Sequence, residues 1–119
     1  MSIKFKDNSQ EILSKFGKAK DNALTAIGMT AEGYAKDETP VDTGRLRNSM
    51  ANAVDGDSVY IGSNVVYAPY VELGTRSNVA HHMLQKAATN HSDEYKRLAE
   101  NEFKNAWRIM LKWYNDINN

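Results

Sequence analysis

The sequence predicts an α+β fold in which a long N-terminal helix is followed by a short antiparallel β-hairpin, a short helix and a long C-terminal helix. Apolar residues recur at spacings of three and four in residues 12–34 and again in residues 84–117, which is typical of amphipathic helices. Between these regions, residues 39–79 contain both prolines and four of the seven glycines. Short segments of alternating polarity in this middle region are typical of strands.

The N-terminal helix is expected to begin after Ser9, whose hydroxyl can cap a helix. Residues 1–8 are expected to be flexible, because they are largely polar. Residues 12–34 also contain three glycines, and each weakens a helix by about 1 kcal/mol relative to alanine. The helix is expected to end near Asp37, because Pro40 disfavours helical geometry in the residue before it.

Residues 47–54 and 58–63 are expected to form the two strands of a β-hairpin, because both segments can alternate between two faces. Asp55-Gly56-Asp57 lies between them and is a turn signal, since an Asp-Gly pair favours positive φ. A helix of one to two turns is expected next. Pro69 suits its first turn, and Gly74 suits the position just past its end.

The last third of the chain is expected to be helical after an exposed, mobile loop at residues 75–82. Residues 84–117 carry the most regular helical pattern in the sequence. One long helix and two helices separated near His91 both fit this pattern, because Ser92 followed by two acidic residues is also a good helix start. The length of 119 residues suits a single domain, residues 1–119.

The composition limits the possible functions. Fifteen basic residues balance fifteen acidic ones, which argues against a dedicated nucleic-acid-binding protein. The chain has no cysteine, so disulfides, thiolate zinc sites and thiol nucleophiles are excluded. No apolar run approaches the roughly 20 residues of a membrane span, and the N-terminus lacks the apolar core of a signal peptide. An intracellular protein without a membrane partner is therefore expected, at least at the time of its synthesis.

The segment Thr39–Ser49, TPVDTGRLRNS, contains the apolar-Asp-Thr-Gly pattern that holds the catalytic aspartate of aspartic proteases. One copy per chain would require a homodimer in which two Asp42 carboxyls share a proton. The retroviral-type protease fold is almost entirely β-sheet, unlike this sequence, and Arg45 and Arg47 would favour ionisation of both carboxyls. A turn in which Asp42 and Thr43 bond backbone N–H groups explains the segment better.

The three histidines do not predict a metal site. His81 and His82 precede His91 by nine or ten residues, which is about 14 Å of rise along a helix, and no carboxylate lies at ligand spacing between them. The sequence also lacks a Walker loop and the GxSxG and HExxH motifs. No metal, cofactor or catalytic residue is therefore expected.

The C-terminal helical region carries Trp107, Trp113 and Tyr114, which cannot all point in one direction on a single helix. Two interpretations remain open for these side chains. They belong to the core, or some of them form an aromatic surface that a partner covers. All three are candidate interface residues under the second interpretation.

Two motifs in order, TPVDTGRLRNS and then VYIGSNVVYAPYVELGT, resemble a family of small head–tail joining proteins from long-tailed, lambdoid-type bacteriophages. Members of this family are described as neck, head–tail connector or tail-completion proteins. The resemblance is strong over residues 39–75. The segment after the loop often carries a proline and a phenylalanine in this family, whereas HHMLQKAAT, residues 81–89, lacks the proline.

The resemblance implies a non-catalytic structural protein that is made in the host cytoplasm and built into the neck or tail of the virion. It implies a homo-oligomeric ring, six-fold or twelve-fold, around the DNA passage. Other phage neck or tail proteins would be its partners, and DNA would pass through without sequence-specific binding. The alternative is a small, non-catalytic binding or regulatory domain.

The resemblance also implies structural roles for the matched residues. The matched residues of the first motif would hold the turn between the N-terminal helix and the hairpin. Those of the second motif would form the short helix that closes the sheet. Either Arg45 or Arg47 is expected to pair with Glu72. The matched residues are Pro40, Asp42, Thr43, Gly44, Arg45 and Leu46 in the first motif, and Tyr67, Pro69, Tyr70, Glu72, Gly74 and Thr75 in the second.

Overall fold

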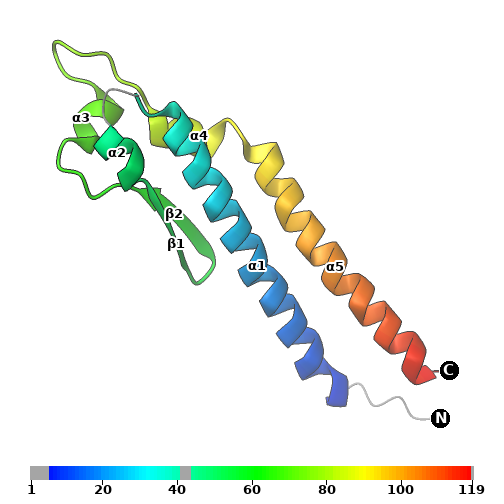
Figure 1. Ribbon diagram of the computed structural model, residues 1–119. Coiled ribbons are helices and arrows are strands. Elements are labelled where there is room, and N and C mark those ends of the chain that lie inside the picture. The colour runs from blue at the N-terminus through cyan, green and yellow to red at the C-terminus, as the bar shows by residue number, and fades with distance from the viewer. Residues whose placement is uncertain (1–5, 41–43, 119) are drawn as a thin grey trace.

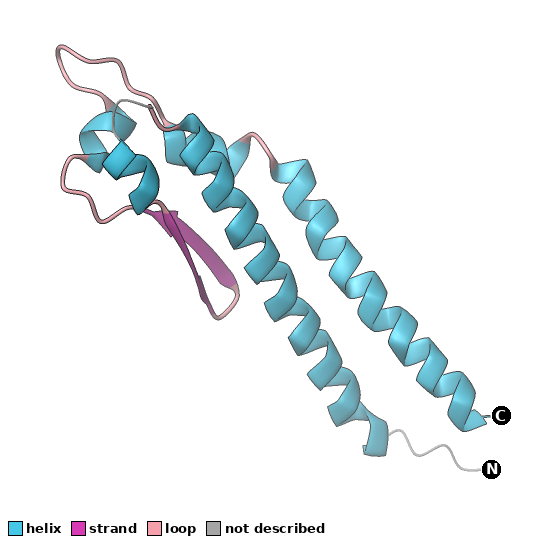
Figure 2. Ribbon diagram, in the orientation of Figure 1, coloured by secondary structure: helices cyan, strands magenta, loops and turns pink. Residues whose placement is uncertain are grey.

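The computed structural model describes the backbone of residues 6–40 and 44–118, and these residues form five helices and two strands (Figures 1 and 2). The order confirms the predicted α+β fold with a long helix at each end and a hairpin between them. The elements are α1 (Lys6–Glu38), α2 (Gly44–Ser49), β1 (Ala51–Asp55), β2 (Ser58–Gly62), α3 (Ala68–Leu73), α4 (Met83–Thr89) and α5 (Ser92–Asn118).

The molecule is long and thin. Its principal extents are 75 × 21 × 20 Å and its radius of gyration is 20.2 Å, whereas a compact domain of this length has a radius of gyration of about 13–14 Å. Helices α1 and α5 run antiparallel and form a two-helix stem, and the remaining elements gather at one end as a head (Figure 1). A shape of this kind leaves much of the chain at the surface.

The core lies in the head, around the C-terminal end of α1. Leu46 from α2 and Met83 from α4 are its largest fully buried side chains. The other buried members of the cluster are Ala35, Met50, Val65, Ala68 and Ala87. Every helix from α1 to α4 therefore supplies at least one side chain to a single apolar cluster.

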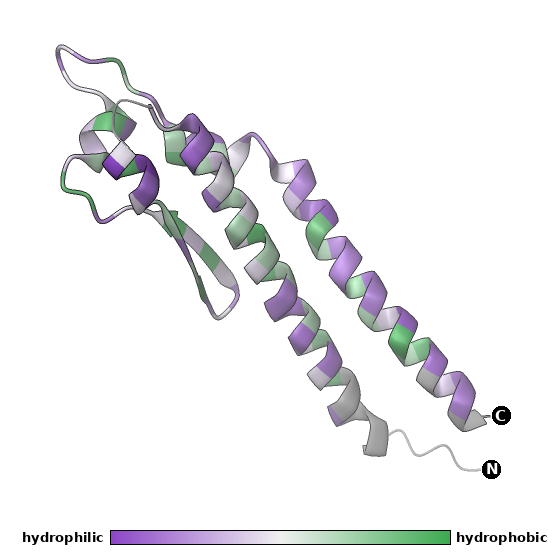
Figure 3. Cartoon of the chain, in the orientation of Figure 1, coloured by the Kyte–Doolittle hydropathy of each residue, from purple (hydrophilic) through white to green (hydrophobic). Residues whose placement is uncertain are grey.

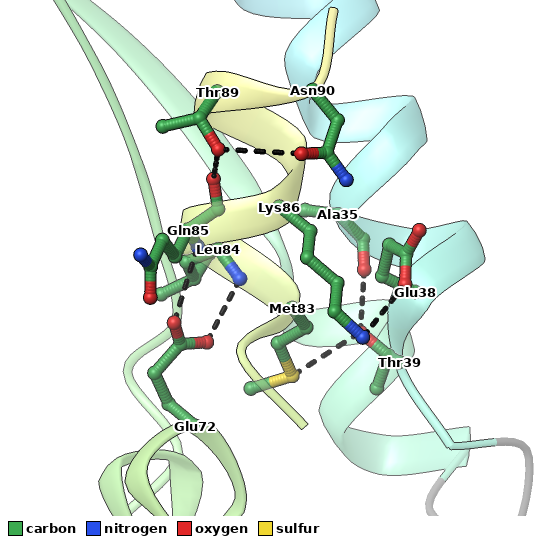
Figure 4. Close-up of polar contacts among 10 residues, drawn as sticks. All are labelled: Ala35, Glu38, Thr39, Glu72, Met83, Leu84, Gln85, Lys86, Thr89 and Asn90. Carbon is green, nitrogen blue, oxygen red and sulfur yellow. Dashed lines mark hydrogen bonds and ion pairs between the residues drawn. The ribbon is translucent and has the colours of Figure 1, made fainter. Parts of the chain in front are cut away.

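The contact between α1 and α4 also includes polar bonds, which Figure 4 shows in close-up. The buried hydroxyl of Thr39 donates a hydrogen bond to the Ala35 carbonyl oxygen at 2.6 Å and lies 3.5 Å from the sulfur of Met83. The Lys86 ammonium lies 3.8 Å from the Glu38 carboxylate. These contacts hold α4 against the end of α1 and satisfy a hydroxyl that would otherwise be buried without a partner.

The seam between the two stem helices is made of small side chains. Ala19 and Ala23 of α1 and Ala106 of α5 are all less than 10% exposed. Because alanine occupies so little space, the helices approach closely and bulkier residues lie beside the seam. Phe103 and Trp107 are exposed for this reason, and Figure 3 shows hydrophobic patches interspersed with hydrophilic residues along α5.

The β-hairpin packs against α1, which separates it from α5 (Figure 1). Asp55 pairs with Ser58, which leaves a two-residue turn that begins at Gly56 with φ of 59°, as the predicted turn requires. The hairpin approaches α1 at Gly28. A Cβ atom there would lie 2.6 Å from the Asn52 side-chain oxygen, so glycine permits the close contact.

The structure corrects two expectations about element boundaries and decides between two alternatives that the sequence left open. Residues 47–49, predicted as strand, belong to α2, because Leu46 and Met50 are both buried and a spacing of four fits a helical turn. Helix α1 begins at Lys6, three residues before Ser9, so residues 6–8, which were expected to be flexible, are helical. The C-terminal region, for which one or two helices fitted, is two helices separated at Asn90 and His91.

An ion pair fastens the hairpin turn to the stem. The Lys20 ammonium donates a hydrogen bond to the Asp57 carboxylate at 2.5 Å, and this bond and the lysine charge lower the pKa of Asp57 below its usual 3.8. The stabilising contribution of Asp57 is therefore present near neutral pH and is lost as the pH falls through the lowered pKa.

Replacing Lys20 with alanine is expected to return the pKa of Asp57 to its usual range, because both causes of the shift are removed. The measurement is a pH titration of the Asp57 carboxyl carbon by NMR. Lys18→Ala is the matched control and should leave the Asp57 titration unchanged. An Asp57 pKa that is the same in Lys20→Ala and in the unaltered chain would contradict the ion pair.

Candidate functional site

The two sequence motifs meet in the head. Leu46 of the first motif and Ala68, within the second, belong to the same buried cluster. The Arg45 guanidinium lies over the Tyr67 ring, 6.0 Å from its centroid, which is within the range of a cation–π contact. The described residues of the two motifs thus pack α2 against the segment that contains α3.

The short helix α3 forms as the turn residues predict. Pro69 lies in its first turn and Tyr67 at its N-cap, while Gly74 at its C-cap has φ of 79°. Tyr70 is exposed on the outer side of α3. Asp42 and Thr43, which were expected to hold the preceding turn, lie outside the described residues.

The Glu72 side chain, in α3, caps the N-terminus of helix α4, although residues 75–82 separate the two helices in the sequence. Its carboxylate oxygens accept hydrogen bonds from the backbone N–H groups of Leu84 at 2.8 Å and Gln85 at 3.1 Å (Figure 4). These are among the N–H groups at the start of α4 that have no partner inside the helix, and the positive end of the helix dipole attracts the carboxylate.

The expected pair between Glu72 and Arg45 or Arg47 was wrong. Arg47 lies 3.8 Å from Asp37 instead, and Arg45 contacts the Tyr67 ring. The α4 N-terminus offers Glu72 two fixed backbone donors without the side-chain ordering that an arginine partner requires.

Residues 75–82 form an exposed connection without helix or strand, as predicted, but its two ends are fastened. The backbone N–H groups of His81 and His82 donate to the Val71 and Glu72 carbonyl oxygens at 2.9 and 3.1 Å. Thr75 and Asn78 exchange a second pair of bonds across the loop. The mobility of the loop stays a prediction, confined by these bonds to the residues between its fastened ends.

Replacing Glu72 with alanine is expected to destabilise the chain by about 1–2 kcal/mol, because two N–H groups of α4 lose their side-chain partner. Urea denaturation followed by circular dichroism measures this change. Glu100→Ala removes an exposed carboxylate of α5 that caps no helix and should cost less than about 0.5 kcal/mol. Equal losses in the two variants would contradict the capping role.

The junction of α4 and α5 is held to α1 by aromatic contacts. The His91 ring stacks on the Tyr34 ring with centroids 3.4 Å apart, and the Tyr34 hydroxyl donates to the Glu94 carboxylate, which raises the pKa of Tyr34. The Tyr95 hydroxyl donates to the Ala87 carbonyl oxygen at 2.5 Å. These contacts fix the direction in which α5 leaves the head.

The histidines have separate environments. His91 stacks on Tyr34, His81 is exposed, and His82 is partly buried with its Nδ1 atom lacking a hydrogen-bond partner. Within residues 6–40 and 44–118, no group of three or more histidine or acidic residues is arranged to hold a metal ion. In the same part of the chain, no helix is sufficiently long and apolar to cross a membrane.

The stem presents an aromatic face, defined here by Phe16, Phe103, Trp107 and Leu111. These residues line an open hollow of about 550 Å³ together with Glu100, Lys104 and Arg108. The Phe16 and Phe103 rings stack across the two helices, 6.1 Å between centroids. Trp107 is 53% exposed, so more than half of a large apolar side chain remains in contact with water.

A second hollow, of about 320 Å³, lies between the same two helices. Its floor is formed by the buried Ala19 and Ala106, and it is called the alanine groove below. The residues at its rim are Lys15, Lys18, Asn22, Glu102, Asn105 and Ile109.

Of the three candidate interface residues, Trp107 and Tyr114 are about half exposed, and the Trp113 side chain lies outside the described part of the structure. Sequence reasoning missed Phe103 and Leu111, because their spacing in α5 also fits a core position. The signal that distinguishes them is the alanine at position 106, which occupies the seam and displaces the larger residues to its side.

A family model described as "Bacteriophage HK97-gp10, putative tail-component" matches residues 3–74. This match covers more than half of the chain, so the chain belongs to this family of phage tail components. The match includes α1, α2, the hairpin and α3, and it ends at Gly74, before α4 and α5. Neither the curated proteins nor the solved structures contained a significant match to the chain.

Proposed function

We propose that this chain is a non-catalytic structural component of the head–tail junction or the top of the tail, where its copies form a closed ring. It is assembled in the host cytoplasm and contacts other neck or tail proteins above and below the ring. Membership of a phage tail-component family supports the structural role, and the two motifs in residues 39–75 support a position near the junction.

The observation that carries the assembly proposal is the exposed apolar surface of the stem. Four large apolar side chains lie on one side of α5 and are at least 38% exposed: Phe103, Trp107, Leu111 and Tyr114. Contiguous apolar surface on a soluble chain indicates a protein–protein contact. Among the described elements only α1 packs extensively against α5, so this surface is available for another chain to cover.

The balance of charge supports a ring through which DNA passes. The chain carries equal numbers of basic and acidic residues. A strongly cationic passage would bind phosphates with an affinity that depends on salt and would retard the DNA. A neutral subunit avoids this salt-dependent affinity for phosphates, as a passage for DNA requires.

The proposed function is tested by deleting the gene from the phage that encodes it and restoring it from a plasmid. Deletion is expected to yield DNA-filled heads and tails that fail to join or tails that are incomplete, as seen by electron microscopy. The protein is expected in purified virions by mass spectrometry. Normal, infectious particles without the protein would contradict the role. Pepstatin-sensitive peptidase activity of the purified chain that disappears in Asp42→Asn would contradict the non-catalytic assignment.

A further inference from the structure

We propose that neighbouring copies in the ring associate through the two edges of the hairpin, with the β1 edge of one copy paired to the β2 edge of the next. The strands would then form one antiparallel sheet that continues from copy to copy. This inference rests on the proposed ring and names backbone contacts that would build it. The hairpin belongs to residues 3–74, the part of the chain that the family model matches.

Both edges of the hairpin are open. In the described part of the chain the sheet has two strands, β1 and β2, so each strand has a neighbour on one side. Helix α1 covers a face of this sheet and neither edge, because Asn52 of β1 and Val59 of β2 both lie against Gly28. Unpaired backbone groups along an open edge can bind a strand from another molecule.

The strand register shows which backbone groups point outward. Asp55 pairs with Ser58 across the two-residue turn, and such a turn closes with a hydrogen bond between these residues. Hydrogen-bonded pairs alternate with pairs that are not hydrogen-bonded along an antiparallel ladder. The residues whose N–H and C=O groups point away from the partner strand are therefore Asn52 and Val54 on β1, and Val59 and Ile61 on β2.

The sequence does not protect these edges. Lysine, proline, bulges and very short strands are the devices that usually prevent pairing at an edge. Neither strand contains lysine, arginine or proline, and Asp55 beside the turn is their one charged residue. All five residues of each strand pair one to one without a bulge, and five residues is an ordinary strand length. Both edges can therefore accept another strand.

A second copy is the occupant that fits both edges. A strand from a different protein would cover one edge of each hairpin and leave the other open. In a ring of identical copies, the β1 edge of each copy meets the β2 edge of the next, so no edge remains. Such a contact joins two different surfaces and is heterologous, as a closed ring requires, and closure of a sheet removes its edges altogether.

The layering of the subunit leaves both edges accessible. Ala23 belongs to the seam with α5 and Gly28 lies against the hairpin, and these two positions are about 140° apart around the axis of α1. The hairpin and α5 therefore lie on different sides of α1 (Figure 1). The ion pair between Lys20 and Asp57 holds the hairpin turn beside the stem. Among the described elements only α1 packs extensively against the hairpin, so a neighbouring copy can reach either edge.

Cysteine cross-linking tests the contact, because the chain has no cysteine of its own. Ala53→Cys in β1 and Tyr60→Cys in β2 are made in separate chains, and both positions are exposed. Full overlap of the two edges places position 53 of one copy opposite position 60 of the next, in a pair that is not hydrogen-bonded. The Cα atoms of such a pair are about 4.5 Å apart, which is within the range of a disulfide.

An equimolar mixture of the two variants, oxidised at high concentration, is expected to form at least about tenfold more covalent dimer than either variant alone. Electrophoresis without reductant measures the yield, and mass spectrometry identifies the mixed dimer. A disulfide in either variant alone would join two like edges, which the proposed ring does not bring together.

A second substitution tests whether the backbone makes the contact. Val54→Pro, added to the Ala53→Cys chain, removes an outward N–H group of β1 and keeps the hydrogen bonds inside the hairpin, since proline is tolerated on an edge strand. It is expected to lower the yield of mixed dimer about tenfold. Val54→Ala keeps the N–H group and is the matched control, which should leave the yield unchanged. Circular dichroism checks that both chains are folded.

Three results would overturn the proposal. One is efficient cross-linking of Ala53→Cys or Tyr60→Cys alone, which would indicate contact between like edges. Another is an equal yield with Val54→Pro and Val54→Ala, and the third is a mixture without mixed dimer at the highest soluble concentration. All three concern the purified chain, so they leave the virion experiment unaffected, and absence of the protein from virions would instead contradict the proposed function.

Discussion

Replacing Leu46 with alanine is expected to lower the free energy of unfolding by about 3 kcal/mol. Leu46 is 0% exposed and lies in the cluster that joins α1, α2, α3 and α4. Truncating a buried leucine removes its transfer free energy and leaves a cavity that neighbours fill only in part, at a cost of about 2–5 kcal/mol. Urea denaturation monitored by circular dichroism gives the value.

Leu13→Ala is the matched control, because it makes the same chemical change at a position that is 70% exposed on α1. Its effect on the free energy of unfolding should be within about 0.5 kcal/mol. Both variants are compared at low protein concentration, so that association through the stem does not contribute. A loss below about 1 kcal/mol for Leu46→Ala would show that the head does not pack around α2.

The position of Leu46 also explains which parts of the fold the sequence could predict. Long helices repeat their apolar spacing over many residues, so the pattern in residues 12–34 and 84–117 was sufficient for α1 and α5. Helix α2 has six residues, of which only Leu46 is buried, so no apolar spacing can repeat within it. Arg45 and Arg47 alternate around Leu46 and imitate a strand, which is why residues 47–49 were predicted incorrectly.

Turn chemistry was predicted more reliably than buried contacts. Gly56 and Gly74 both adopt positive φ, a local requirement that the residues themselves reveal. The capping of α4 by Glu72 could not be read in this way, because its partners are 12 and 13 residues away and approach only when the loop folds back. A carboxylate has many possible partners in a sequence, and the folded backbone selects one.

The candidate interface was predicted in part for a related reason. Aromatic residues are recognisable in a sequence, so Trp107 and Tyr114 could be named as possible surface residues. Which side of α5 faces α1 depends on small residues, and the burial of Ala106 decides it. The alanine groove has no aromatic or charged signature of its own, and only the packing of the two helices reveals it.

Replacing Gly74 with alanine is expected to destabilise the chain by about 2 kcal/mol. Gly74 has φ of 79°, and a Cβ atom there would lie 2.8 Å from the backbone nitrogen of Ala80. With ψ of 172° as well, Gly74 lies in a region of backbone conformation that is essentially restricted to glycine and costs other residues about 1–3 kcal/mol. A backbone atom such as the Ala80 nitrogen also cannot move aside as a flexible side chain can. The strain falls on the loop base, so amide exchange of His81 and His82 should also accelerate.

Gly33→Ala is the matched control with the opposite expected sign. Gly33 lies within α1, and a Cβ atom there would meet nothing within 4 Å, so alanine should stabilise the helix by about 0.5–1 kcal/mol. Thermal unfolding of the two variants compares them directly. Opposite shifts would show that the closed base of the loop requires glycine at position 74. The closed loop base brings Glu72 to the N-terminus of α4 and so sets the position of α4. The position of α4 in turn determines where α5 begins. Stabilisation by both substitutions would instead mean that the loop base opens in solution.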